Sequence, residues 1–233
     1  MVSMNFDFHL HTIYSQDSIL HPQKIIKVAK RKGLRGIAVT DHDTIRGALK
    51  TKAIVGKDDT FKVIIGAEVK TNCGDVIGLF LDEDIVSKDF IEVCDEIKKQ
   101  GGVVVLPHPY RRKDLFALKE LLKYVDLIEV LNARISKNLN YKAQLLAKER
   151  GLTSIGGSDA HTSFEIGRVQ TILEDCASLD DNDIRKCLLN GEVRIVGTEL
   201  PFHLRILSTS IGKYKKEGFT SLIKAGYRIA LGR

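Results

Sequence analysis

The chain has 233 residues, 43% of them hydrophobic and 28% charged, which is enough to bury a sizeable core as one domain or as one domain with an appendage. No apolar run reaches about 18 residues and no amino-terminal signal region is evident, so we expect no transmembrane helix and a cytoplasmic protein. The four cysteines form no CxxC pair, so we expect reduced thiols.

Charge divides the chain into two parts. The net charge is +6, and from Leu200 onward seven lysines and arginines stand against Glu217 alone, so this segment carries the whole net charge. We therefore expect a body, residues 1–199, and a helical, basic amphipathic tail, residues 200–233. Such a tail can contact an anionic surface or nucleic acid, but branched apolar residues such as Ile206 and Ile211 favour packing on the body. We expect the tail to be ordered and dispensable for chemistry.

Apolar segments typical of strands alternate along the body with amphipathic segments typical of helices. The predicted helices begin near Pro22, Thr44, Ser87, Leu115, Leu139 and Asp180. The predicted strands are residues 6–10, 36–39, 63–65, 75–81, 103–106, 127–131, 153–157, 169–173 and 193–196. This alternation favours a parallel sheet, closed or open. The glycine-rich phosphate loop usual in open doubly wound sheets does not occur in the sequence, which favours a (β/α) barrel.

The first strand carries the pattern Asp7-Phe8-His9-Leu10-His11. Its apolar and polar residues alternate, which predicts one apolar face and one polar face. The two imidazoles are then about 7 Å apart by strand rise, close enough for both to bind one ion.

Side chains of the types that bind metal ions gather where later strands end. With the first strand they form the set His9, His11, Asp17, His42, Glu68, Asp75, His108, Asp159 and His161. Imidazole and carboxylate without thiolate suit Zn²⁺, Mn²⁺ or Fe. Unpaired, such groups are costly to bury, so their concentration predicts a metal centre. We expect Asp7 and Asp41 to orient the ligands rather than to bind the metal.

Five segments resemble the motifs of a known superfamily in order and spacing. They are Asp7-x-His9-x-His11, Thr40-Asp41-His42, Glu68, His108-Pro109 and Gly157-Ser158-Asp159-Ala160-His161. The chain is similar in them to the PHP (polymerase and histidinol phosphatase) superfamily, and residues 102–109 and 132–134 look most like its small stand-alone phosphoesterases, which act on nucleotides or short RNA. The resemblance implies a distorted seven-stranded (β/α) TIM-like barrel with a trinuclear metal centre that hydrolyses phosphoesters.

The resemblance also implies a role for each ligand at three divalent ions, Mn²⁺, Fe²⁺ or Zn²⁺. The three ligand sets are His9, His11, Glu68 and Asp159; Glu68, His108 and Asp75; and Asp17, His42 and His161. Several members of the superfamily carry histidine in place of Asp17 or Asp75, and the two carboxylates shift the preference from zinc towards Mn²⁺ or Fe. The implied nucleophile is a hydroxide bridging two metals.

A phosphoester also needs guanidinium groups to bind its oxygens, and Arg111, Arg134 and Arg168 are the candidates. Asp43, His203 or a metal-bound water could protonate the leaving group. The expected partner is a small phosphorylated substrate such as a nucleotide.

Three other functions stay open at this stage. An exonuclease on short single-stranded RNA or DNA would need stacking aromatics, which are only 6% of the chain. Amidohydrolase-like cleavage of C–N bonds also uses His-x-His, but the arginines argue against it. A metal-binding regulatory or structural module is disfavoured because unneeded buried charge is costly to keep.

Overall fold

The computed structural model describes residues 3–111, 120–190 and 192–218. Its strands are β1 (Met4–Leu10), β2 (Gly36–His42), β3 (Lys62–Thr71), β4 (Gly74–Leu79), β5 (Val103–Leu106), β6 (Leu127–Asn132), β7 (Thr153–Gly157), β8 (Val169–Leu173) and β9 (Val193–Gly197). Within the described ranges they form one sheet, in the order β7-β6-β5-β4-β3-β2-β1-β8-β9. The sheet curls until β7 meets β1, where Leu10 bridges Ala160 and the Asp159 N–H donates to the His9 carbonyl at 2.7 Å. A Cβ on Gly157 would overlap His9, so a glycine permits this closure.

The predicted α/β, barrel-like fold is confirmed, although its nine strands differ from the seven that the family resemblance implied. Three strands are antiparallel to their neighbours: β4 between β3 and β5, β8 beside β1, and β9 beside β8. The other six run parallel to one another. The segment at 63–65 extends to Thr71, because β3 and β4 continue as a hairpin past the end of β2. Glu68 therefore lies within a strand and not at its end.

The helices are α1 (Pro22–Arg31), α2 (Arg46–Val55), α3 (Phe90–Lys99), α5 (Lys137–Arg150), α6 (Asp181–Asn190) and α7 (Phe202–Glu217), with a short 3₁₀ turn at Leu122–Tyr124. Pro22 opens α1 because a first-turn residue needs no N–H partner. The helix predicted to begin near Ser87 is α3, and its cap is Asp89, whose carboxylate accepts from Ile91 N and Glu92 N. The helix predicted from Leu115 falls largely on residues 112–119, outside the described ranges.

The first strand departs from strict alternation. Phe6 and Phe8 stack at 5.2 Å within a cluster whose buried residues come mostly from the eight strands β1 to β8 and from helix α6. Leu10 instead packs with Ile25 and Ala29 of α1 on the outside. The register of β1 against β2 shifts between Asp7 and Leu10, and such a bulge re-aims the following side chains. His9 therefore turns to the same interior as Phe8, at one end of the barrel.

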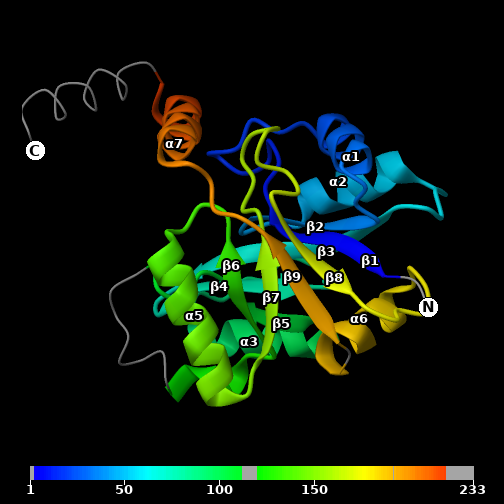
Figure 1. The fold of residues 1–233 in the computed structure, drawn as a ribbon, viewed down its shortest axis with the longest axis vertical. Helices are drawn as coiled ribbons and strands as arrows, with labels where there is room; N and C mark the ends of the chain where they lie inside the picture. Colours follow the sequence, from blue (N-terminus) through cyan, green and yellow to red (C-terminus); the bar gives the residue numbers. More distant parts are fainter. Residues whose placement is uncertain (1–2, 112–119, 191, 219–233) are drawn as a thin grey trace, which may run out of the picture.

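The helix α7 stands apart from the helices that flank the sheet, beyond the end of β9 and beside the loop that follows β1 (Figure 1). It covers the described part of the predicted tail, and residues 219–233 lie outside the described ranges. Among the described residues, none of the helices has the length and apolarity needed to cross a membrane.

Candidate metal centre

The structure brings all nine predicted ligands together at one end of the barrel. They come from β1, β2, the β3–β4 hairpin and the loops that follow β1, β5 and β7. Two of the loop residues, His108 and Asp159, have positive φ, 28° and 52°. A residue with a side chain loses about 1–3 kcal/mol of stability at such a backbone angle, so the surrounding structure must hold it there. Both backbone N–H groups are held, since His108 donates to Glu129 and Asp159 to His9.

The first ligand set converges closely. His9 Nε2 lies 3.2 Å from His11 Nε2, and both nitrogens face Glu68 Oε2, at 3.5 and 3.3 Å. Asp159 Oδ1 lies 3.7 Å from the first nitrogen and 3.4 Å from the second. Four ligand atoms arranged tetrahedrally about 2.1 Å from one ion stand roughly 3.4 Å apart, so the spacing fits a cation at their centre.

Carboxylate oxygens without a well-formed hydrogen bond support the same conclusion. Glu68 Oε2, Asp159 Oδ1 and Asp17 Oδ1 are buried and make no well-formed hydrogen bond with a described residue. The first two face histidine nitrogens, at 3.3–3.7 Å. A buried carboxylate oxygen left in this way is unfavourable. A bound cation would supply the missing interaction, and the donor set therefore fits a metal ion.

The second set lies on the other side of Glu68. Glu68 Oε1 is 3.0 Å from His108 Nε2, and ligand atoms of Asp75, Glu68 and His108 all lie within 4.8 Å of one another. The two oxygens of Glu68 therefore face different groups of ligands, which is the arrangement a bridging carboxylate needs.

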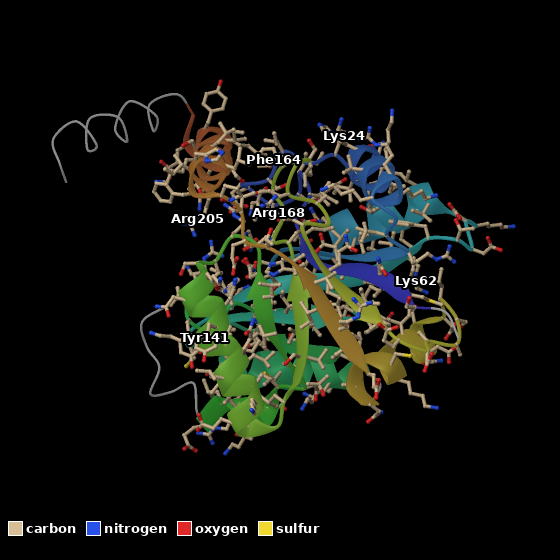
Figure 2. All side chains as sticks on the ribbon, viewed as in Figure 1. Lys24, Lys62, Tyr141, Phe164, Arg168 and Arg205 are labelled. Atoms are coloured by element: carbon tan, nitrogen blue, oxygen red, sulfur yellow. The ribbon has the colours of Figure 1, made fainter. Side chains whose placement is uncertain are left out.

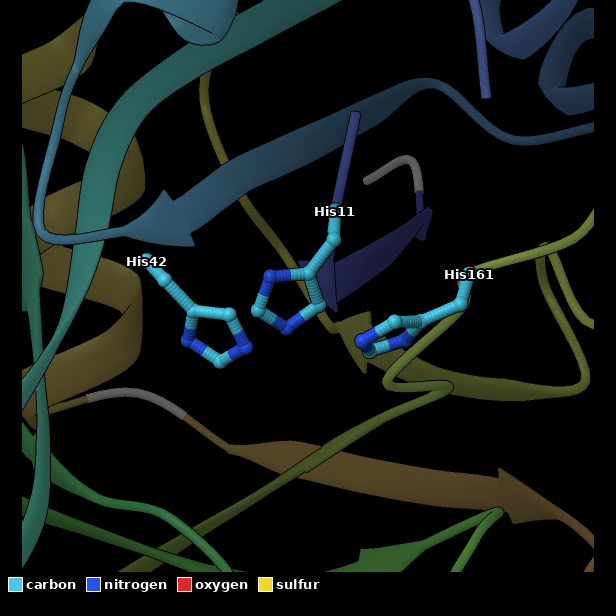
Figure 3. A group of neighbouring side chains, drawn as sticks. All are labelled: His11, His42 and His161. Atoms are coloured by element: carbon cyan, nitrogen blue, oxygen red, sulfur yellow. The ribbon is translucent and has the colours of Figure 1, made fainter. Parts of the chain in front are cut away.

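The third set contains one more histidine than the family resemblance implied. The rings of His11, His42 and His161 face a common space, with ligand nitrogens within 4.8 Å of one another (Figure 3). Asp17 Oδ2 lies 3.5 Å from His42 Nε2 and 3.3 Å from His161 Nε2. His11 thus stands between the first and third sets.

The charges of these groups are strongly coupled. Burial favours the neutral ring of His11, yet its contacts with Asp159 and Glu68 raise its pKa to about 9. Burial likewise opposes the charge of Glu68, but its contacts with His108, His11 and His9 hold its pKa well below the usual range. Burial and the nearby charge of Arg134 lower the pKa of His161 to about 4. Without metal, protonated histidines balance the carboxylates, and a divalent cation could replace those protons.

Sequence reasoning missed Glu129, a buried carboxylate in the middle of β6. Its Oε1 lies 3.0 Å from His9 Nδ1, and its Oε2 accepts from His108 N at 3.0 Å and from Asn132 Nδ2 at 2.9 Å. Glu129 therefore contacts His9 at Nδ1, whereas Nε2 of the same ring faces His11 and Glu68. The signal was present, because a charged residue interrupts the apolar run Leu127–Leu131.

Asp41 and Asp7 lie behind the ligands. Asp41 accepts from Thr12 N at 2.7 Å and from Ser15 Oγ at 2.6 Å, and that hydroxyl lies 3.2 Å from His11 Nδ1. The Ser15 hydroxyl therefore links Asp41 to His11, one of the predicted ligands. Asp7 accepts from Ser158 N at 2.9 Å and from Gly167 N at 2.8 Å, which ties β1 to the loop that carries Asp159.

The three predicted arginines lie in different places. Arg111 Nη1 is 3.5 Å from Asp159 Oδ2 and 3.4 Å from His108 Nε2, and its side chain is 46% exposed. Arg134 is largely buried, with Nη1 3.9 Å from Asp159 Oδ1. Arg168 lies where β9 leads into α7 (Figure 2) and donates to the Glu199 carbonyl at 3.0 and 3.2 Å. The first two face the ligand cluster, whereas the third is occupied elsewhere.

A pocket of about 640 Å³ opens over the ligands. Its lining includes Asp17, His42 and Glu68, together with the cationic side chains of Lys70, Arg111 and Lys216. Of the candidate proton donors, Asp43 lines this pocket and accepts from Lys88 Nζ at 2.6 Å. His203 is exposed in the first turn of α7.

Comparison with known proteins gives consistent results. Residues 7–164 match the model of the PHP domain, and residues 137–193 match a model described as PHP-associated. An uncharacterized protein of Methanocaldococcus jannaschii is 42% identical over 145 residues, covering 56% of this chain and 82% of that protein. A probable phosphatase of a Thermoanaerobacter species is 26% identical over 204 residues, covering 72% of this chain and 83% of that protein. A crystal structure of a two-domain protein from Bacteroides vulgatus containing a predicted PHP-like metal-dependent phosphoesterase has a TM-score of 0.72 at 21% identity, covering 90% of this chain and 69% of that one; at this identity the likeness concerns the fold alone.

Proposed function

Because the chain belongs to the PHP domain family, we propose that it is a metal-dependent phosphoesterase that hydrolyses phosphate esters of small substrates such as nucleotides. The observation that carries this proposal is the convergence of imidazoles with buried carboxylate oxygens that make no well-formed hydrogen bond, under a pocket with cationic side chains. The similarity to a probable phosphatase supports it.

The proposed ligands are the nine residues of the three sets, at three divalent ions, Mn²⁺, Fe²⁺ or Zn²⁺. When bound, such ions would lower the pKa of a coordinated water to about 7 and polarise phosphoryl oxygens. Glu68, which faces two sets, would hold two of the ions at a fixed separation. Glu129 would keep the proton of His9 on Nδ1, which leaves Nε2 free to bind a cation.

The substrate is held by positive side chains of the chain itself. A guanidinium presents two N–H groups to two phosphate oxygens, and Arg111 and Arg134 lie beside the ligands in position to do so. Lys70 and Lys216 line the same pocket and would attract a further anionic group of the substrate. This lining suits a phosphate ester better than a neutral amide.

A second candidate is exonuclease activity on short RNA or DNA. The observation that favours it is Tyr14, which lines the pocket and is 42% exposed, because an exposed ring can stack on a base. Short oligonucleotides therefore belong in the substrate screen beside the small esters.

The test is phosphate release from mononucleotides, nucleoside bisphosphates, sugar phosphates and short RNAs, each with Mn²⁺, Fe²⁺ or Zn²⁺. We expect metal-dependent release from at least one class. A Glu68→Gln variant should fold but lose that activity, whereas Glu83→Gln, on an exposed loop, should retain it. Absence of hydrolysis by metal-loaded wild type, or wild-type turnover in Glu68→Gln, would refute the proposal.

A further inference from the structure

The helix α7 is fastened to the loop that follows β1. The ammonium of Lys215 donates to the carbonyl oxygens of Ile13, Ser15 and Ser18, at 2.8, 2.7 and 2.6 Å. An ammonium has three protons to donate, so these contacts use all of them. The three acceptors flank Asp17 on both sides.

The backbone of α7 also touches Asp17 itself. A Cβ added to Gly212 would lie 2.7 Å from the Asp17 carbonyl oxygen and 3.3 Å from the Asp17 Cβ. Real Cβ atoms do not approach a backbone oxygen so closely, so only glycine lets the helix lie this near. Gly212 is buried in the middle of α7.

Asp17 needs such support more than the other proposed ligands. It lies in an irregular loop and its side chain is 37% exposed, whereas the histidines it faces are placed by β2 and by the loop after β7. A metal ligand must be held to about half an ångström by its surroundings. The neighbouring residue Ser18 is fixed by its own side chain, whose hydroxyl lies 2.8 Å from the His11 carbonyl oxygen and 3.3 Å from that of His161.

We propose that α7 is a positioning element of the third metal set, with Lys215 and Gly212 holding Asp17 opposite His42 and His161. The helix thereby belongs to the site rather than to a dispensable tail. The proposal rests on the metal centre of the proposed function. It gives a role in binding one ion to α7, which lies outside residues 7–164, the part of the chain that matches the PHP domain.

The experiment is calorimetric titration of metal-stripped full-length protein with Mn²⁺, with bound metal counted by mass spectrometry. Asp17→Ala first identifies the ion that depends on this ligand. Lys215→Met removes the three contacts with the loop, and Gly212→Ala separates the helix from Asp17 without changing charge. Outer partners of metal ligands typically contribute tenfold to a hundredfold in affinity. We expect both variants to weaken the Asp17-dependent ion by that factor and to leave the other ions unchanged.

Two controls match the changes on the same helix. Lys213→Met removes an equal charge two residues along, at an exposed position outside the pocket lining, and should leave all metal affinities unchanged, as should Thr209→Ala, also at an exposed position. If Asp17→Ala loses an ion while Lys215→Met and Gly212→Ala both bind every ion with wild-type affinity, α7 does not position Asp17. Loss of every ion, or unfolding, in both variants would also overturn the proposal, since the support would then be general. Full metal binding by Asp17→Ala would instead remove Asp17 from the third set, and the inference with it.

Discussion

Glu129→Gln is the substitution for which the structure gives the sharpest expectation. The carboxylate faces His9 Nδ1 with one oxygen and accepts from His108 N and Asn132 Nδ2 with the other. Glutamine keeps the shape but replaces one acceptor oxygen with a donor group. Asn132 cannot turn to compensate without loss, because its own Oδ1 accepts from Arg134 N at 2.8 Å.

Both orientations of the new amide are unfavourable. With its NH₂ towards His108 N, two donors face each other, and an unsatisfied buried donor costs about 1–3 kcal/mol of stability. With its NH₂ towards His9 Nδ1, the ring proton moves to Nε2, the atom that faces Glu68 and Asp159. Metal affinity should then fall about tenfold to a hundredfold, which corresponds to roughly 1.4–2.7 kcal/mol.

Two measurements separate these effects. Chemical denaturation of the metal-free protein reports the loss of stability, and calorimetric titration with Mn²⁺ reports the loss of affinity. Glu83→Gln is the matched control on the surface and should change neither. If Glu129→Gln binds Mn²⁺ within threefold of wild type and is equally stable, Glu129 does not orient His9 and the reasoning fails.

Arg111→Ala should lower kcat/KM by about tenfold to a hundredfold with metal content unchanged, because a charge-assisted contact contributes roughly 1.5–3 kcal/mol. The kcat/KM of Arg168→Ala should stay within threefold of wild type, because this guanidinium binds a carbonyl outside the pocket. Equal effects of the two substitutions in steady-state kinetics would contradict this. Metal binding at pH 7 should release at least one proton per chain, and metal affinity should rise as the pH rises towards 9. The reason is that the pKa of metal-free His11 is raised to about 9, whereas a histidine that binds metal must be neutral. Calorimetry in two buffers of different ionisation enthalpy measures the protons released, and binding without proton release would refute the prediction. A thiol reagent should label exposed Cys73 in the native protein and spare Cys94, which is buried and whose pKa burial raises to about 12; peptide mass spectrometry measures both, and equal labelling would count against the packing described.

The sequence was sufficient for the parts of the site that depend on residue type and strand order. The carboxyl ends of parallel strands lie at one edge of the sheet, so the strand order alone predicts that His9, His42 and His108 lie together. Alternation failed at the β1 bulge, because a register shift leaves no mark in the hydrophobic pattern. The hydrophobic pattern also gives no partner for Glu129, because His9, which it contacts, lies 120 residues away in the sequence. Only the curled sheet brings that pair together.

The described part of the basic tail makes contacts that composition alone does not predict. The net charge separates the chain at residue 200, yet the pocket takes Lys216 from one side of that boundary and Lys70 and Arg111 from the other. Lys215 meanwhile binds the backbone of the loop that carries Asp17. Residues 1–199 are formally neutral, so bound metal ions would make them positive only near the pocket. Lys216 of α7 adds positive charge at the same place, where an anionic ester would enter. Two basic residues of the described part of the tail, Lys215 and Lys216, therefore lie beside the proposed active site.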